Sequence, residues 1–275
     1  MATTTPFQTL FAVPMTCDGC AKDITNALYK LPGILKVETN VKDQLVSIEG
    51  TAAPSAIVKA IQDTGRDAIL RGSGTSNSAA VSILETYHHG ADEQADSSAG
   101  AELTPNGIWV NKRLVRGLAR MVQVSPTETL VDLTVRGVPP GTYRATIRQT
   151  GNLTDGVTST GPVWSSLAPD QEVTNGDSQK QSTPRGFLGT VEVGPNGYGT
   201  VFLNKPFQVW EVIGRALVVS RQEEHGQEGL QNSEDTVVGV IARSAGVWDN
   251  DKTVCSCTGK TLWEERRDEV KKGML

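Results

Sequence analysis

Hydrophobic and polar positions follow two different periods within residues 1–72. Four short stretches are apolar or alternate at every second residue, which is typical of β-strands, and two repeat every three to four residues, which is typical of helices. In chain order these are a strand at 8–13, a helix at 21–30, strands at 34–41 and 45–48, a helix that begins near Pro54, and a strand at 67–71. This βαββαβ order predicts a ferredoxin-like α+β domain.

A linker and an all-β domain are expected next. Residues 73–79 are rich in serine, glycine and threonine, which is the composition of a flexible linker. Many short apolar stretches separated by Gly, Pro and Asn then occupy residues 80–247, at 80–87, 130–136, 191–193, 200–203, 216–219 and 237–242. Such a series predicts an all-β Greek-key barrel or sandwich. On it, Val131, Leu133 and Val135 are expected to share one face.

The last segment, residues 248–275, differs in composition from both domains. It contains a charged stretch at 261–272 in which Asp268 and Lys272 stand at a favourable i,i+4 spacing. Trp263 and Val270 give this stretch only a thin apolar side. We therefore predict a largely irregular tail with a weak helix that does not pack on the rest of the chain.

Composition and charge narrow the function classes. The 275 residues carry 26 basic and 31 acidic side chains, a formal net charge of −5, whereas nucleic-acid-binding domains normally carry a basic excess. The longest apolar runs are far shorter than the roughly 20 residues of a membrane span, and the first six residues do not resemble a signal peptide. We expect no nucleic-acid partner, no membrane span and a cytoplasmic location; a fraction in the mitochondrial intermembrane space is left open.

The four cysteines form two close pairs at opposite ends of the chain. Cys17 and Cys20 make a C-x-x-C pair, and Cys255 and Cys257 make a C-x-C pair. Without a secretory signal, such spacings indicate metal binding or thiol exchange rather than a disulfide framework. The three histidines (His88, His89 and His225) form no cluster, and we interpret the adjacent pair as exposed loop residues.

The first pair lies in the stretch Met15-Thr-Cys-Asp-Gly-Cys20, which resembles the M-x-C-x-x-C loop of heavy-metal-associated domains. The resemblance implies a Cu(I) site formed by Cys17 and Cys20, with Met15 supporting the loop from inside and Arg66 placing a cation near the sulfurs. Soft thiolates favour Cu(I), and a helix N-terminus near Cys20 favours the thiolate. Two alternatives stay open: a redox C-x-x-C of the thioredoxin type, and a structural zinc shared by all four cysteines.

The central domain resembles Cu,Zn superoxide dismutase. The resemblance rests on the glycine-punctuated stretches 186–189, 214–219 and 239–241 and on the strand order around them. Positions where that enzyme places copper-ligating histidines hold Thr146, Arg148 and Ser220. Val238 stands where a disulfide cysteine is expected, and Asp235 where an active-site arginine is expected. The resemblance therefore implies a docking domain without the enzyme's metal ligands.

The whole chain resembles the family of copper chaperones for superoxide dismutase, most specifically in Cys255-Ser-Cys257-Thr-Gly-Lys-Thr-Leu-Trp-Glu-Glu-Arg267. This resemblance implies a metallochaperone, not an enzyme of independent activity. It implies Cu(I) as cargo and Cu,Zn superoxide dismutase as the partner, bound as a heterodimer through the central domain.

The tail has its own expected part in that activity. Cys255 and Cys257 are expected to bind Cu(I) and to form the target's disulfide by thiol–disulfide exchange, because a C-x-C disulfide is strained and easily exchanged. A homodimer of the free chain is left open. Two alternatives remain: a copper-sensing regulatory protein that delivers nothing, and an active superoxide dismutase with a fused metal domain.

Overall fold

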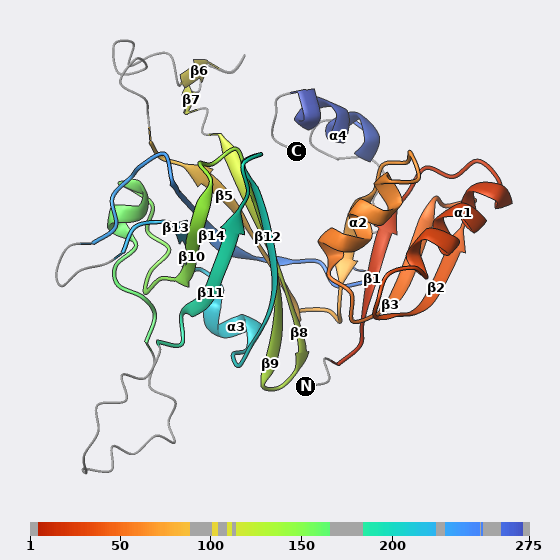
Figure 1. The fold of residues 1–275 in the computed structure, drawn as a ribbon, viewed down its shortest axis with the longest axis horizontal. Coiled ribbons are helices and arrows are strands. Elements are labelled where there is room, and N and C mark those ends of the chain that lie inside the picture. Colours follow the sequence, from red (N-terminus) through yellow and green to blue (C-terminus); the bar gives the residue numbers. More distant parts are fainter. Residues whose placement is uncertain are drawn as a thin grey trace.

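The computed structural model describes residues 5–88, 101–103, 109–111, 114–165, 184–223, 229–247, 249 and 260–271. A small α+β domain and a larger β-barrel stand side by side, and a C-terminal helix, α4, lies near α2 of the first domain (Figure 1).

The first domain is an antiparallel four-stranded sheet with the strand order β2-β3-β1-β4 and two helices. Its elements are β1 (Phe7–Ala12), α1 (Asp18–Leu28), β2 (Ile34–Asn40), β3 (Leu45–Gly50), α2 (Pro54–Gln62) and β4 (Ile69–Ser73). Both helices bury the side chains that the sequence pattern placed inward: Ile24 and Leu28 on α1, Ile57 and Ile61 on α2. These four pack with Phe11 of β1 in one core. The ferredoxin-like prediction is confirmed.

The second domain is an eight-stranded antiparallel sheet that curls into a nearly closed barrel, with the order β11-β10-β13-β14-β5-β8-β9-β12. Its strands are β5 (Ala79–Thr86), β8 (Val115–Ser125), β9 (Glu128–Arg136), β10 (Gly141–Ile147), β11 (Phe187–Val193), β12 (Tyr198–Lys205), β13 (Ala216–Ser220) and β14 (Thr236–Ser244). The two edge strands, β11 and β12, are joined by a tight turn in which Gly197 has a positive φ of 70°. The barrel prediction is confirmed.

Shorter elements complete the fold. They are the strand pair β6 (Ala101–Leu103) and β7 (Trp109–Asn111), a 3-10 turn η1 (Gly156–Ser159), and the helices α3 (Val209–Val212) and α4 (Leu262–Lys271).

Strand β9 shows why the two domains associate. Val131, Leu133 and Val135 point into the barrel core, as their alternation predicts. The opposite face meets the first domain, where Leu130 packs with Phe7 of β1. Asp132, which is 1% exposed, accepts hydrogen bonds from the backbone N–H and the hydroxyl of Ser55, at 2.8 and 2.7 Å. Because Ser55 lies in the first turn of α2, a barrel carboxylate caps a helix of the first domain.

The connection between the domains is a fixed turn, and the expectation of a flexible linker at 73–79 was wrong in this respect. Strand β4 continues to Ser73, Gly74 donates to the carbonyl of Gln8, and Val247 donates back to Gly74. A Cβ on Gly72 would lie 2.1 Å from the carbonyl oxygen of Gly246. Small residues are therefore needed here because two backbones touch, and composition alone does not distinguish that need from flexibility.

The helix predicted in the tail is present as α4, but it contacts the first domain, which was not expected. Thr261 and Glu264 make a reciprocal capping box: the Thr261 N–H donates to the Glu264 carboxylate at 2.8 Å, and the Glu264 N–H donates to the Thr261 hydroxyl at 3.3 Å. Asp268 pairs with Lys260 at 2.6 Å, whereas Lys272, its expected partner, lies outside the described residues.

Candidate metal centre

The C-x-x-C pair lies where the chain turns from β1 into α1. Cys17 is the N-cap residue, with extended backbone angles (φ −159°, ψ 169°), and Cys20 lies in the first turn of the helix. No side chain caps this helix end, so its free N–H groups and its dipole favour negative charge at the two sulfurs.

The two thiols are free and close together. Their Sγ atoms are 3.7 Å apart, Cys17 is exposed and Cys20 is half-buried. With metal–sulfur bonds of about 2.3 Å, one ion reaches both sulfurs at this separation. The arrangement is that of a two-coordinate soft-metal site open to solvent on one side, which allows an incoming ligand to take the ion.

Arg66 supplies a positive charge beside Cys20. Its guanidinium donates to the Asp23 carboxylate and to the Thr64 carbonyl, both at 3.2 Å, and it also bonds to the Cys20 sulfur. A hydrogen bond from the backbone of Thr16, then those from Arg66, the Thr16 hydroxyl and Cys17, lower the pKa of Cys20 to about 6. Cys20 is therefore mostly thiolate at neutral pH, the form that binds metal.

Met15 lies beneath the loop rather than at the metal position. It is 2% exposed and packs in the core with Val13, Ala21 and Ala68. Its assigned role as a support of the loop, like the ligand roles of Cys17 and Cys20, stays a prediction.

The barrel positions that hold copper ligands in a dismutase carry other buried side chains here. Thr146 and Arg148 are buried at the end of β10, where the Nε and Nη2 groups of Arg148 donate to the Gly161 carbonyl. Ser220, on β13, shares a 2.6 Å hydrogen bond with the hydroxyl of Thr236. Within the described part of the chain, no group of three or more His, Cys, Asp or Glu side chains could hold a metal ion.

The two remaining dismutase-related positions are also described. Val238 is 1% exposed and packs in a small cluster with Ala216 and Val218. Asp235 pairs with Arg221 at 3.4 Å. His88 is exposed, whereas His89 and His225 lie outside the described residues.

The second thiol pair, Cys255 and Cys257, also lies outside the described residues. The helix that follows it contacts the first domain: Nε and Nη2 of Arg266 both donate to the Asp67 carboxylate at 3.0 Å. Asp67 adjoins Arg66, so the tail helix is anchored next to the cation of the metal loop. Sequence reasoning missed this contact, although the T-x-x-E capping box at Thr261–Glu264 is a signal for a well-formed helix.

Comparison with known proteins agrees with this geometry. Residues 9–67 match the heavy-metal-associated domain family, and residues 115–242 match the copper/zinc superoxide dismutase family. A thiol pair in the first fold, joined to a dismutase-like barrel in which the expected copper-ligand positions hold Thr146, Arg148 and Ser220, defines a metallochaperone class of protein.

Full-length relatives specify the family. The chain is 40% identical over 273 residues to the superoxide dismutase 1 copper chaperone of Saccharomyces cerevisiae, covering 98% of both chains. It is 41% identical to the protein of the same name from Debaryomyces hansenii, over 98% of this chain and 99% of that one. The copper chaperone for superoxide dismutase of Homo sapiens is 32% identical over 93% of this chain and 88% of its own length. The chain belongs to the family of copper chaperones for superoxide dismutase, and the family prediction is confirmed.

No helix among the described residues is long and apolar enough to cross a membrane.

Proposed function

We propose that the chain takes up copper as Cu(I) through Cys17 and Cys20 and delivers it to immature Cu,Zn superoxide dismutase. The observation that carries the proposal is the pair of free sulfurs 3.7 Å apart at the start of α1, beside the partly buried cation of Arg66, in a member of this family. A site with two soft ligands and an exposed side holds the ion and still lets a partner's ligand compete for it.

The barrel serves as the docking surface. It keeps the dismutase frame while Thr146, Arg148 and Ser220 fill the ligand positions, so what it retains is a shape that pairs with dismutase subunits. Trp210 on α3 supports a contact face, because its side chain is 65% exposed. Tryptophan is enriched among the residues that dominate the binding energy of protein–protein interfaces.

The tail completes the maturation of the target. In the proposed step, a disulfide between Cys255 and Cys257 exchanges with two thiols of the dismutase through a mixed disulfide. The target gains its intrasubunit disulfide, the tail is reduced to two thiols, and electrons and protons balance without a further reagent. The same two thiols accept Cu(I) on its way from the first domain.

The test is to incubate the Cu(I)-loaded chain with reduced, copper-free superoxide dismutase and to follow enzyme activity and target disulfide together. Delivery predicts that both rise with the wild-type chain, and that replacement of Cys255 and Cys257 by serine stops disulfide formation without abolishing docking. A copper-sensing protein would fail to bind the dismutase in a pull-down. An active dismutase would show activity without any partner. We further propose a cytoplasmic location, which fractionation of cells, including their mitochondria, would check.

A further inference from the structure

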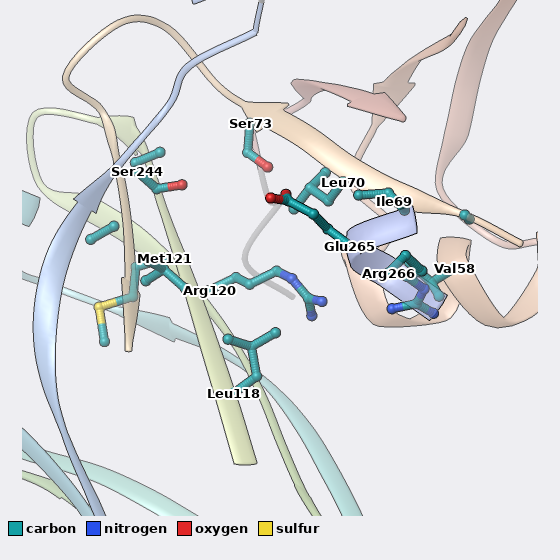
Figure 2. A pocket seen from close by; sticks show the side chains of 14 residues that line it. Val58, Ile69, Leu70, Ser73, Leu118, Arg120, Met121, Ser244, Glu265 and Arg266 are labelled. Atoms are coloured by element: carbon teal, nitrogen blue, oxygen red, sulfur yellow. The ribbon is translucent and has the colours of Figure 1, made fainter. Parts of the chain in front are cut away.

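Two adjoining cavities lie where the first domain, the barrel and α4 meet. One, of about 340 Å³, is lined by α2, β4, β5, β8 and α4 (Figure 2). The other, of about 820 Å³, lies between α2 and the outer faces of β8, β9 and β12. Val58, Leu118, Arg120 and Arg266 line both. Their volumes are typical of small-molecule sites.

The charged side chains that line the two cavities are mostly basic, whereas the chain as a whole is acidic. The charged lining side chains are four cations and two acids: Lys59, Arg120, Arg136 and Arg266 against Asp63 and Glu265. The chain as a whole carries −5. Asp63 is paired with Lys59 at 3.2 Å, and Glu265, whose carboxylate is turned toward Ser73 in Figure 2, has a partner of its own. Arg266 gives its Nε–H and one Nη2 hydrogen to Asp67, at 3.0 Å each, and Arg120 contacts Asp132 at 3.5 Å. Because a guanidinium has five N–H groups, both arginines keep further donors, and Arg136 forms no ion pair among the described residues.

Arg120 is the central group of this cluster. Its side chain is 21% exposed, projects from β8 into the cavity (Figure 2), and forms an ion pair with Asp132 in which Nη1 lies 3.5 Å from the carboxylate. That distance is long for a hydrogen bond, and the Asp132 carboxylate already accepts two shorter bonds from Ser55. Burial lowers the pKa of Arg120, Asp132 opposes this, and the positive charge of Arg266 adds to the lowering. A largely buried guanidinium with a long ion-pair contact thus lines both cavities.

Two further groups have unused donors there. Arg136 forms no ion pair among the described residues, and burial together with the charges of Arg116 and Arg266 lowers its pKa. Ser73 is 4% exposed, its hydroxyl has no hydrogen-bond partner in the described structure, and it lines the smaller cavity. A buried donor without a partner costs stability, as does the mutual repulsion of guanidiniums. A bound anion would relieve both.

We propose that this junction binds a phosphate-type oxyanion between Arg120 and Arg266, with Arg136 contributing from the wider cavity. Planar guanidinium forks donate pairs of hydrogen bonds to tetrahedral oxyanions. The smaller cavity has room for free phosphate and the larger one for the phosphate of a small metabolite. Because α4 forms one wall, the bound anion holds α4 against the first domain by mass action.

The experiment titrates the full-length chain with inorganic phosphate at constant ionic strength, kept with sodium chloride, by calorimetry and by NMR of the arginine Nε–H groups. Saturable binding with a Kd near or below about 1 mM is expected, together with slower amide exchange in α4. Arg120→Gln weakens binding at least about tenfold and Arg136→Gln about threefold. Arg267→Gln, an exposed change of the same charge on α4, leaves it unchanged.

Parallel titrations use glycerol phosphate, ADP and citrate. They show whether the site prefers free or organic phosphate, and whether it prefers phosphates to carboxylates. Tighter binding of an organic phosphate assigns the wider cavity to its organic part. Absence of saturation with all phosphates at about 20 mM, equal binding by Arg120→Gln, or a preference for citrate overturns the proposal. If Arg120→Gln fails to fold, the phosphate affinities of Arg136→Gln and Arg267→Gln are compared instead, because Arg136 takes no part in the ion pair with Asp132. Equal affinities in these two variants then overturn the proposal. No ligand of the copper site takes part, so the copper chemistry is unaffected by either result.

Discussion

The first domain and the barrel both belong to folds that hold metals, yet they treat the metal position in opposite ways. In the first domain the two thiols of the candidate site, Cys17 exposed and Cys20 half-buried, are not joined by a disulfide and lie at a helix start whose N–H groups and nearby Arg66 favour thiolate. In the barrel the corresponding positions hold Thr146, Arg148 and Ser220, which are all buried, and Arg148 and Ser220 are hydrogen-bonded to neighbours. A fold can therefore be kept for the surface that it presents after its site is lost, and function has to be argued from the site.

The largest expected effect is on copper binding. In a chain whose Cys255 and Cys257 are serine, the added changes Cys17→Ser and Cys20→Ser should lower bound copper from about one ion per chain to below about a tenth, because no other soft ligand pair remains. Met15→Leu, a core change of similar volume, should keep the copper. Metal analysis and thiolate absorption measure this. Full copper binding in the quadruple variant would show that the metal binds elsewhere, and the first domain would then no longer differ from the barrel as the metal-binding part.

Arg148→Ala should lower the stability of the chain and leave its copper binding unchanged. It removes a buried guanidinium and two donors to Gly161, so the free energy of unfolding should fall by about 2–4 kcal/mol while copper binding stays constant. Arg144→Ala, an exposed change on the same strand, should cost no more than about 0.5 kcal/mol. Denaturant titration measures both. A loss of copper in Arg148→Ala would contradict the separation of the two domains' tasks.

Trp210→Ala tests whether the barrel is the docking part. We expect its affinity for copper-free dismutase to drop about tenfold or more, because a large exposed ring is truncated at the proposed contact face. Leu35 on β2 is similarly exposed, at 59%, and Leu35→Ala is the matched control in the first domain. Calorimetry with each variant gives the affinities, and equal losses in both would remove the distinction between docking and metal-holding domains.

The smallest expected effect concerns Arg66. Its positive charge favours the Cys20 thiolate, whose pKa is about 6, so Arg66→Ala should raise that pKa and lower the thiolate fraction at pH 7. Alkylation of Cys20 at pH 7 should slow about threefold, and its pH midpoint should move upward. Lys22→Ala changes a charge on the same helix without contact to the sulfur. Mass spectrometry of the Cys20 peptide across pH follows both variants, and a wild-type midpoint near pH 9 would refute the assignment of Arg66.

Sequence patterns predicted what depends on local periodicity. The βαββαβ order and the inward side of β9 follow directly from apolar spacing, and the C-x-x-C pair was found at a helix start because both signals are local. The sequence could not reveal contacts between distant residues. Ser55 with Asp132, and Arg266 with Asp67, join positions 77 and 199 residues apart. The composition of residues 73–79 indicated a flexible linker because the backbone contact between Gly72 and Gly246, which fixes this connection, cannot be read from the sequence.

The backbone contact between Gly72 and Gly246 also bears on how far copper has to travel. Any side chain at either position would force the two strands of chain apart, and Ser55 and Phe7 fasten the same two domains elsewhere. The distance from Cys17 and Cys20 to a dismutase docked on the barrel is thus set by the fold rather than by the swing of a tether. Under the proposed function, the part of the transfer path that runs from this thiol pair to the barrel therefore has a constant length.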